Sequence, residues 1–230
     1  MDIMQVSLSN LKDHFVAYID ILGFTDMVKN DFLINPKNPL YITKLYDFHK
    51  SMQSLITNES EDIGFIQFSD SIVISTEYDK SKFVNFVKLI SKFQYDLFCE
   101  GIFCRGGIAY GKHFFENNFM YSHGLIEAYI IENEISINPK IVISSDLFEL
   151  LYPYNNVDSN LCVLKDEDGT IFIDYLKNYD SADCDKILSA VTLRKNTNPK
   201  VISKYRWLNR YINFKQISTQ NTNVSTFEEV

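Results

Sequence analysis

Residues 17–25 read AYIDILGFT, a nearly unbroken apolar run that carries one acid, Asp20, and ends at the turn residue Gly23. A second apolar run, residues 65–74, reads FIQFSDSIVI and carries Asp70 near its centre. Short apolar runs of this kind are typical of strands that are buried in a sheet. Burying an acid in such a strand costs free energy unless a partner compensates its charge. The two runs therefore predict two sheet strands and a shared polar site.

Two carboxylates on neighbouring strands can hold Mg²⁺ or Mn²⁺, and such a site also binds the phosphates of a substrate. We predict that Asp20 and Asp70 are metal ligands and that the backbone carbonyl of Ile21 is a further oxygen ligand. The alternative is local: Asp20 would cap a turn, and Asp70 would form an Asx-turn in a hairpin. The occurrence of both acids in strands this apolar favours the metal site.

The remaining sequence predicts an alternation of strands and helices around these runs. Apolar spacing predicts strands at 15–24, 63–68, 72–76, 102–111, 140–144, 161–164 and 170–175, and helices at 41–56, 81–98, 124–135, 145–151 and 183–217, the last interrupted near 196–199. Residues 31–40 are predicted to be a loop. This order indicates an α+β, ferredoxin-like fold with helices packed on a mostly antiparallel sheet and a C-terminal helical segment.

Composition sets limits on the class of protein. The chain has 230 residues, of which 46% are hydrophobic, so it can form a substantial core. Its net charge of −8 argues against a nucleic-acid partner, which requires clustered Lys and Arg. No uninterrupted apolar stretch is long enough to span a membrane. The four cysteines form no CxxC pair and no signal peptide is evident, so we expect a cytoplasmic protein with reduced thiols.

We expect one main domain with short additions. The predicted boundaries are a lead-in at 1–13, a catalytic domain at 14–180, a helical extension at 181–217 and a polar, frayed tail at 218–230.

Several residues near the two acids are candidates for substrate contacts. The turn formed by Gly23, Phe24 and Thr25 follows Asp20 directly, and a helix that begins there would point free N–H groups at a phosphate. Arg105 precedes two glycines in a predicted strand, and it can pair with Asp20 or Asp70 or contact a phosphate. Lys112, near the end of that strand, is a weaker candidate for a phosphate contact.

These motifs resemble a known family. Asp20-Ile21-Leu22-Gly23-Phe24-Thr25, Phe68-Ser69-Asp70-Ser71 and residues 105–111 (RGGIAYG) are similar to the class III nucleotidyl cyclase catalytic domain. The similarity is closest to the Pycsar-type bacterial anti-phage pyrimidine nucleotide cyclases, and it covers about residues 14–150. Residues 124–132 (GLIEAYIIE) and 139–144 (PKIVIS) also resemble that branch.

The resemblance implies an enzyme of the phosphorus–oxygen lyase class. Two Mn²⁺ or Mg²⁺ ions held by Asp20, Ile21 and Asp70 would activate the ribose 3′-hydroxyl of a nucleoside triphosphate, whose cyclisation releases pyrophosphate. Arg105 is a candidate catalytic cation. The family places each site at a head-to-tail homodimer interface, so this chain is expected to form a homodimer with shared sites. The product would act on a separately encoded cyclic-nucleotide effector in anti-phage defence.

The chain departs from purine cyclases of the family in two places. Ala128 and Glu132 stand where those enzymes carry the Asn and Arg that position the ribose and stabilise the transition state. Ile66 stands where they often carry a Lys or Glu that reads the base. The resemblance therefore implies a pyrimidine substrate, with UTP favoured over CTP, in a base pocket lined by Phe65, Ile66 or Phe68, with Tyr121 reaching in from the other side.

Two other functions fit the same residues. A nucleotide-binding module that kept the fold and lost the reaction would explain Ala128 and Glu132. An unrelated metal-dependent phosphohydrolase could use the same two carboxylates.

Overall fold

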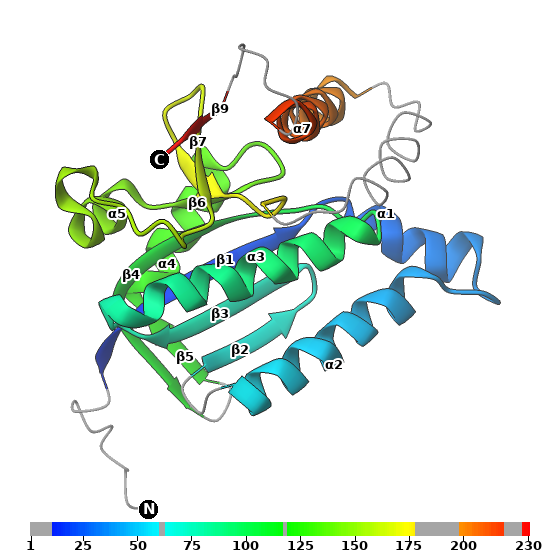
Figure 1. Ribbon diagram of the computed structural model, residues 1–230. Coiled ribbons are helices and arrows are strands. Elements are labelled where there is room, and N and C mark those ends of the chain that lie inside the picture. Colours follow the sequence, from blue (N-terminus) through cyan, green and yellow to red (C-terminus); the bar gives the residue numbers. More distant parts are fainter. Residues whose placement is uncertain (1–10, 60–62, 117–118, 178–197, 219–226) are drawn as a thin grey trace, which may run out of the picture.

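The computed structural model describes residues 11–59, 63–116, 119–177, 198–218 and 227–230 (Figure 1). Its strands and helices are, in chain order, β1 (Lys12–Ile21), α1 (Phe24–Lys29), α2 (Tyr41–Glu59), β2 (Ile63–Phe68), β3 (Ser71–Glu77), α3 (Phe83–Cys99), β4 (Cys104–Glu116), β5 (Phe119–Ser122), α4 (His123–Ile130), β6 (Ile141–Ile143), α5 (Ser145–Leu151), β7 (Val163–Asp166), β8 (Ile171–Ile173), α7 (Pro199–Ser218) and β9 (Phe227–Glu229). Short π- or 3-10-helical turns lie at Asn30–Ile34, Lys80–Lys82, Ile131–Ile135 and Pro153–Asn155.

The first four strands form the core of the sheet in the order β2-β3-β1-β4, and each neighbouring pair is antiparallel. Helices α1 and α2 connect β1 to β2, a tight turn connects β2 to β3, and α3 connects β3 to β4. This β-α-β-β-α-β order with antiparallel pairing is the ferredoxin-like arrangement. The predicted α+β fold with a mostly antiparallel sheet is therefore confirmed.

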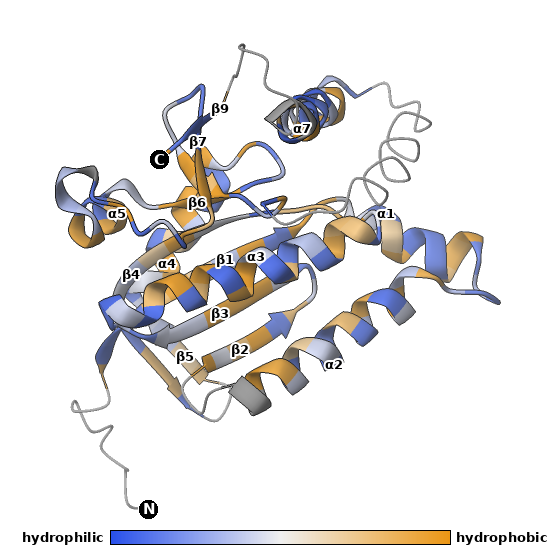
Figure 2. Cartoon of the chain, in the orientation of Figure 1, coloured by the Kyte–Doolittle hydropathy of each residue, from blue (hydrophilic) through white to orange (hydrophobic). Residues whose placement is uncertain are grey.

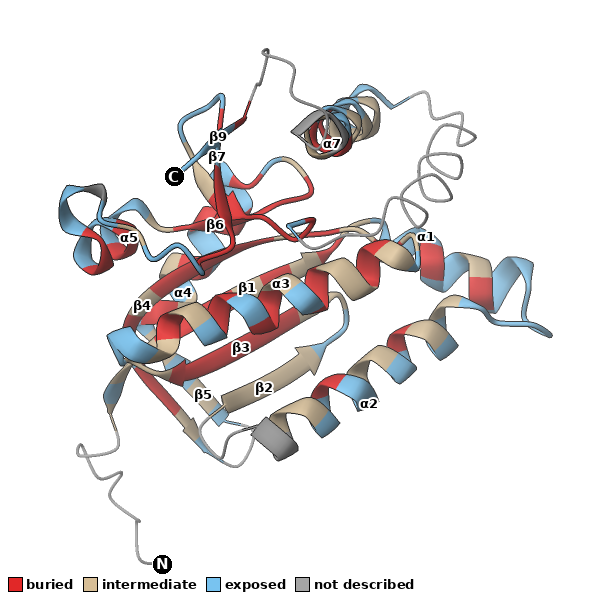
Figure 3. Cartoon of the chain, viewed as in Figure 1, coloured by how far each residue is buried: buried red, intermediate tan, exposed pale blue. Residues whose placement is uncertain are grey.

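Different helices cover the two faces of this sheet (Figure 1). On one face, α3 packs on β1, where the rings of Phe15 and Phe83 lie 4.9 Å apart, and α2 packs on β2, where His49 and Phe65 lie 5.3 Å apart. On the other face, α4 lies across β1 and β4. The buried residues of α3, red in Figure 3, are mostly hydrophobic, as the orange segments of this helix in Figure 2 show.

The alternation of side chains along β1 decides where Asp20 points. Phe15, Ala17 and Ile19 are fully buried in the core on the α3 face. Tyr18 and Asp20 alternate with them and point to the α4 face. The ring of Tyr18 meets that of Tyr129 at 5.4 Å in an edge-to-face contact, which confirms the direction. The acid in the apolar run thus lies on the face of the sheet that α4 covers in part.

Two glycines on β4 let backbone segments approach closely. A Cβ atom on Gly107 would clash with the carbonyl oxygen of Ala128, and one on Gly106 would clash with the carbonyl oxygen of Tyr18. Because both obstacles are backbone atoms, neither can move aside cheaply. Gly107 therefore lets α4 lie directly on β4, and Gly106 lets the backbone of β1 approach closely.

Beyond β4 the sheet continues through the parallel neighbour β6 and then through β8, β7 and β9. Helix α7 packs against this half through a cluster of rings, in which Phe172 lies 5.5 Å from both Trp207 and Tyr211 and 5.8 Å from Phe227. The prediction that residues 218–230 fray is therefore wrong for the last residues, because Phe227 is buried in this cluster and residues 227–229 form β9. The helix predicted over 183–197 lies outside the described residues.

Two connections also differ from the prediction. In the predicted loop 31–40, residues Asn30–Ile34 form a π-helical turn whose buried Asp31 accepts the N–H groups of Leu40 and Ile42 at 3.0 and 2.8 Å. This carboxylate fixes the start of α2. Strand β4 also runs beyond the predicted end at residue 111, because β5 folds back and pairs with it. The domain boundaries remain predictions.

Candidate functional site

Asp20 and Asp70 lie side by side at one edge of the sheet. Asp20 is opposite Ser71 in the β1–β3 register, and the N–H of Ile21 donates to the carbonyl oxygen of Asp70 at 3.0 Å. This hydrogen bond ties the end of β1 to the β2–β3 turn. Ser69 precedes Asp70 in a left-handed conformation (φ +58°), which shapes that turn. The two acids that the sequence singled out are therefore brought together, 50 positions apart in the chain.

The charge around Asp20 fits a divalent cation. Burial raises the pKa of Asp20, the Arg105 guanidinium lowers it and the nearby Asp70 carboxylate raises it, and the balance is a pKa above the usual value. Two carboxylates that repel one another gain from a shared cation, and their hard oxygen atoms match Mg²⁺ and Mn²⁺. Among the described residues no group of three or more His, Cys, Asp or Glu side chains has a metal-binding arrangement. A metal ion here would therefore need backbone or substrate oxygens beside the two acids.

Arg105 stands directly opposite Asp20 across the β1–β4 pair. Its Nε lies 3.5 Å from Asp20 Oδ2, its Nη2 lies 2.5 Å from Glu132 Oε1, and its Nη1 donates to the carbonyl oxygen of Ser136 at 3.3 Å. The predicted proximity of Arg105 to Asp20 is therefore observed. The buried Nε faces Asp20 at ion-pair distance and makes no closer hydrogen bond within the described part of the chain.

Glu132 is the acid that holds Arg105 in place, and sequence reasoning missed this role. It lies in the π-helical turn after α4 and is buried. Burial raises the pKa of Glu132, Arg105 lowers it, and Asp20 raises it further; the net pKa is above the usual value. Glu132 directly follows the apolar residues 128–131 (AYII), and an acid at the end of such a run was the signal that could have pointed to a buried partner.

Helix α7 adds a lysine that the sequence analysis did not identify. Lys204 lines a cleft of about 640 Å³ together with Gly23, Lys29 and Phe103. Burial lowers the pKa of Lys204, as does the positive charge of Arg105, whereas Asp20 and Glu132 raise it; the net pKa is below the usual value. The cleft that Lys204 lines adjoins the β1–α1 turn at Leu22 and Gly23, and neither Asp20 nor Asp70 lines it.

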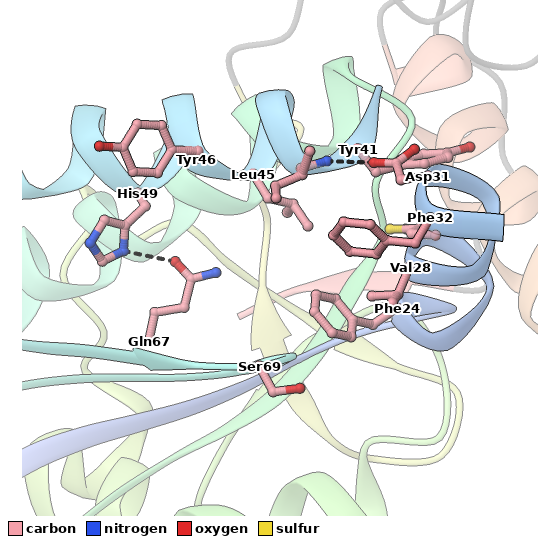
Figure 4. A pocket seen from close by; sticks show the side chains of 12 residues that line it. Phe24, Val28, Asp31, Phe32, Tyr41, Leu45, Tyr46, His49, Gln67 and Ser69 are labelled. Carbon is pink, nitrogen blue, oxygen red and sulfur yellow. Dashed lines mark hydrogen bonds between the residues drawn. The ribbon is translucent and has the colours of Figure 1, made fainter. Parts of the chain in front are cut away.

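The residues of the β1–α1 turn separate into two environments. Gly23 adopts a left-handed conformation (φ +79°) and lines the 640 Å³ cleft. Thr25 is exposed. Phe24 instead points into a second, mostly apolar cavity of about 410 Å³ between α1 and α2 (Figure 4). The six-residue α1 begins with no side-chain cap.

The second cavity has polar side chains at one end. Figure 4 shows Phe24, Val28 and Phe32 on one wall, with Leu45 and Tyr46 from α2 on the other. The side chain of His49 bonds to Gln67 at 2.9 Å, and Ser69 lies at the edge. Asp20 and Asp70 do not line this cavity, so it is separate from the carboxylate cluster.

The predicted base-pocket residues on β2 do not share one face. Phe65 packs toward α2 against His49, whereas Ile66 alternates to the opposite face, which Asp20 also faces. Phe68 points to the same side as Ile66, opposite Ser71, and is 80% exposed. Ile66 and Phe68 can therefore line one surface, and Phe65 cannot join them.

Lys112 and Tyr121 lie far from Asp20 in the same chain. Lys112 is seven residues farther along β4 than Arg105, roughly 24 Å at the rise of an extended strand. Its ammonium pairs with Asp13 at 2.9 Å. Tyr121 lies on β5, which pairs with the far end of β4, and it is 72% exposed. Within one chain the structure does not bring either residue to the carboxylates.

Comparisons with known proteins find a likeness among solved structures. The sequence matches no protein-family model and no curated protein. The structure is similar to that of a class III adenylyl cyclase-like ATP-binding protein from Pseudomonas aeruginosa, with 14% sequence identity and a TM-score of 0.40. The match covers 68% of this chain and 41% of that one, so it spans less than half of the length of that protein.

One further property concerns membranes. In the part of the chain that the structure describes, the helices are all too short or too polar to cross a bilayer.

Proposed function

We propose that the protein is a metal-dependent pyrimidine nucleotide cyclase that converts UTP, or CTP, to the 3′,5′-cyclic monophosphate and pyrophosphate. The single observation that carries this proposal is the adjacency of Asp20 and Asp70 at the ends of β1 and β2, joined by the hydrogen bond from the N–H of Ile21 to the carbonyl of Asp70. The sequence resemblance supplies the reaction class, and the geometry supports its two metal ligands.

In the proposed reaction Asp20, Asp70 and the carbonyl oxygen of Ile21 would hold Mn²⁺ or Mg²⁺. When bound, these ions would lower the pKa of the ribose 3′-hydroxyl and neutralise the triphosphate. The 3′-oxygen then forms a bond to the α-phosphorus while the bond to the bridging oxygen breaks, and pyrophosphate leaves. Arg105, whose Nε lies 3.5 Å from Asp20 Oδ2, would stabilise the charge that develops on the phosphates.

The α4 face supports the proposed homodimer. Ile126, Tyr129 and Ile130 on α4 are 56%, 48% and 37% exposed, although they are large and apolar. Exposed apolar side chains that lie close together mark interaction surfaces. A two-fold arrangement would create two equivalent sites, and it would allow Lys112 and Tyr121 of each chain to approach the partner's carboxylates.

The choice of a pyrimidine rests on Ile66 and Phe68. Both lie on the face of the sheet that Asp20 shares, and neither offers a hydrogen bond to a purine edge. We favour UTP over CTP. The anti-phage role and the effector that would respond to the product belong to this proposal, as does a cytoplasmic location.

A second function is favoured by a specific observation. Arg105 already occupies one side of Asp20 and is held by the buried Glu132, an arrangement that would suit a nucleotide-binding module without turnover. Such a module would bind nucleoside triphosphates and release no pyrophosphate.

The test is to incubate the purified protein separately with ATP, GTP, CTP and UTP in the presence of Mn²⁺ and to identify the products by mass spectrometry. The proposal predicts one cyclic pyrimidine nucleotide and an equal amount of pyrophosphate. Nucleoside monophosphate or free phosphate would instead indicate a phosphohydrolase. Binding without any product, from folded protein, would indicate the nucleotide-binding module.

A further inference from the structure

Helix α7 returns from the far end of the sequence to the β1–α1 turn, which follows Asp20 closely in the chain. Its residue Tyr205 packs edge-to-face on Phe103, just before β4, with ring centroids 6.2 Å apart. The neighbouring Lys204 lines the 640 Å³ cleft opposite Gly23, the residue that ends the β1 turn. Figure 1 shows α7 on the same side of the molecule as α1. The cleft is thus bounded by segments that are about 180 residues apart in the sequence.

Lys204 lines the cleft without a direct ion-pair partner among the described residues, whereas two other cations of α7 are paired. Arg210 pairs with Glu167 at 2.6 Å, and Lys215 pairs with Asp174 at 2.7 Å. Lys204 is half-buried, yet within the described residues it forms no ion pair and no hydrogen bond from its side chain. A half-buried ammonium group without a direct partner retains its donors for a ligand, and a cleft is where such a group serves binding.

The position of Lys204 is fixed by the contacts that follow it on the same helix. One turn later, Trp207 donates its Nε1–H to Asp166 at 2.8 Å, and Asp166 is also held by the fully buried Lys140. Two turns later, the hydroxyl of Tyr211 donates to Asp174 at 2.6 Å. These buried bonds fix the rotation and register of α7, so Lys204 is presented to the cleft from a rigid support.

The cations of β4 are already committed. Arg105 is held by Asp20, Glu132 and the Ser136 carbonyl. Lys112 pairs with Asp13 at the far end of the sheet. Ala128 on α4 and Glu132 in the turn after it carry no positive charge. A polyanionic ligand beside Asp20 therefore depends on cations from outside the sheet and α4, and the cleft offers Lys204 together with Lys29 from α1.

We infer that Lys204 binds the terminal phosphates of the substrate, and the pyrophosphate that leaves, in the cleft between α7 and the β1–α1 turn. This inference rests on the proposed function, because it assumes a nucleoside triphosphate at Asp20. An ammonium-to-phosphate contact is a charge-assisted hydrogen bond, and it strengthens as negative charge grows on the departing pyrophosphate. Lys204 is then a substrate-contacting residue that the chain supplies from its C-terminal helix.

The experiment measures the binding of inorganic pyrophosphate with Mn²⁺ by isothermal titration calorimetry, and turnover of UTP in parallel. The variants are Lys204→Met, which removes the charge, and Lys204→Arg, which keeps it. Lys200→Met is the matched control, because Lys200 is exposed one turn earlier on the same helix. We expect Lys204→Met to weaken pyrophosphate binding about ten- to a hundredfold and to raise the KM for UTP. Lys204→Arg should retain most of the binding. Lys200→Met should have no effect on either quantity.

The outcomes separate this inference from the proposed function. If wild type makes no cyclic product and Lys204→Met loses pyrophosphate binding, these results would support the phosphate site and contradict the cyclase. If wild type makes the cyclic product and Lys204→Met binds pyrophosphate as tightly as wild type does, these results would overturn the role of Lys204 and would not affect the proposed cyclase activity. If Lys204→Met fails to fold, the pair Lys204→Gln and Lys204→Arg decides: equal affinities would overturn the inference. Absence of pyrophosphate binding in the wild type would also overturn it.

Discussion

Arg105 and Asp20 are direct cross-strand partners, and the arginine divides its guanidinium between that half-exposed acid and the buried Glu132. The contact to Glu132 is the shorter, at 2.5 Å against 3.5 Å for Asp20. Glu132 thereby draws the positive charge away from Asp20. This division leaves Asp20 able to accept a metal ion although a cation stands beside it.

Replacing Glu132 tests this division of charge. In Glu132→Gln the full charge of Arg105 would act on Asp20 and oppose a divalent cation. We expect the dissociation constant for Mn²⁺ to rise about three- to tenfold, as the attraction between close charges at a partly exposed site implies. Titration of Mn²⁺ followed by electron paramagnetic resonance measures it. Glu127→Gln on α4, whose half-exposed carboxylate pairs with His123, is the control. Equal or tighter Mn²⁺ binding in Glu132→Gln would show that Glu132 does not shield Asp20.

His113 predicts a pH dependence of stability that is independent of the metal site. Burial, helped by the neighbouring His14, lowers the pKa of His113 to about 4. As the pH falls, His113 is therefore protonated in the unfolded chain before it is protonated in the folded chain. The contribution of His113 to the stability is full above pH 6.5 and is lost between about pH 6.5 and 4. We expect a loss on the order of 2–3 kcal/mol across that interval. Urea unfolding at several pH values gives the free energy of unfolding as a function of pH. Between pH 6.5 and 4 this free energy should fall more steeply for wild type than for His113→Gln, and an equal fall in both would contradict the assignment.

Lys140 anchors the half of the sheet that supports α7. Its ammonium group is fully buried, bonds to Asp166, Asp168 and Thr170, and lies 6.0 Å from the ring centre of Trp207. Lys140→Met would leave the buried Asp166 without its cation, at a cost of about 3–5 kcal/mol.

Equilibrium denaturation measures this cost, with the exposed Lys165→Met as the control. A loss below about 1 kcal/mol, the range of exposed ion pairs, would mean that the network does not hold this region together.

Gly107 predicts a backbone-limited substitution. A Cβ atom there would meet the carbonyl oxygen of Ala128 and the side chain of Ile131, which are held by α4 and the turn after it. Gly107→Ala should therefore destabilise the protein by about 3 kcal/mol, the upper end of overpacking effects. Gly64→Ala is the matched control on β2, because its new methyl group meets the Ser75 hydroxyl, which can rotate away. Equal losses in the two variants would refute this distinction.

Local sequence patterns predicted much of the architecture. The spacing of Phe83, Phe86, Ile90 and Phe93 predicted a helix over 81–98, and α3 spans Phe83–Cys99. The two acidic apolar runs predicted β1 and the β2–β3 hairpin with the turn at Asp70. These elements follow from burial of one face, which leaves a periodic mark in the sequence.

The features that sequence reasoning missed depend on contacts between distant segments. Phe227 stands in a polar tail and becomes a strand residue only because Trp207 and Phe172 offer it a buried surface. The pairing of Arg105 with Glu132 and the approach of Lys204 to the cleft likewise join separate elements. No periodicity records such pairings, so the charge distribution of the site emerged only with the fold.

The most direct test of the central claim is the reaction of wild type and Asp70→Asn with UTP and Mn²⁺, followed by quantifying cyclic UMP and pyrophosphate by mass spectrometry and a coupled assay. The substitution keeps the size of the side chain and removes one negative charge beside Asp20, so the fold should survive, and thermal unfolding verifies this. We predict equal amounts of cyclic UMP and pyrophosphate from wild type and neither product from Asp70→Asn. Wild-type turnover by folded Asp70→Asn would contradict the account.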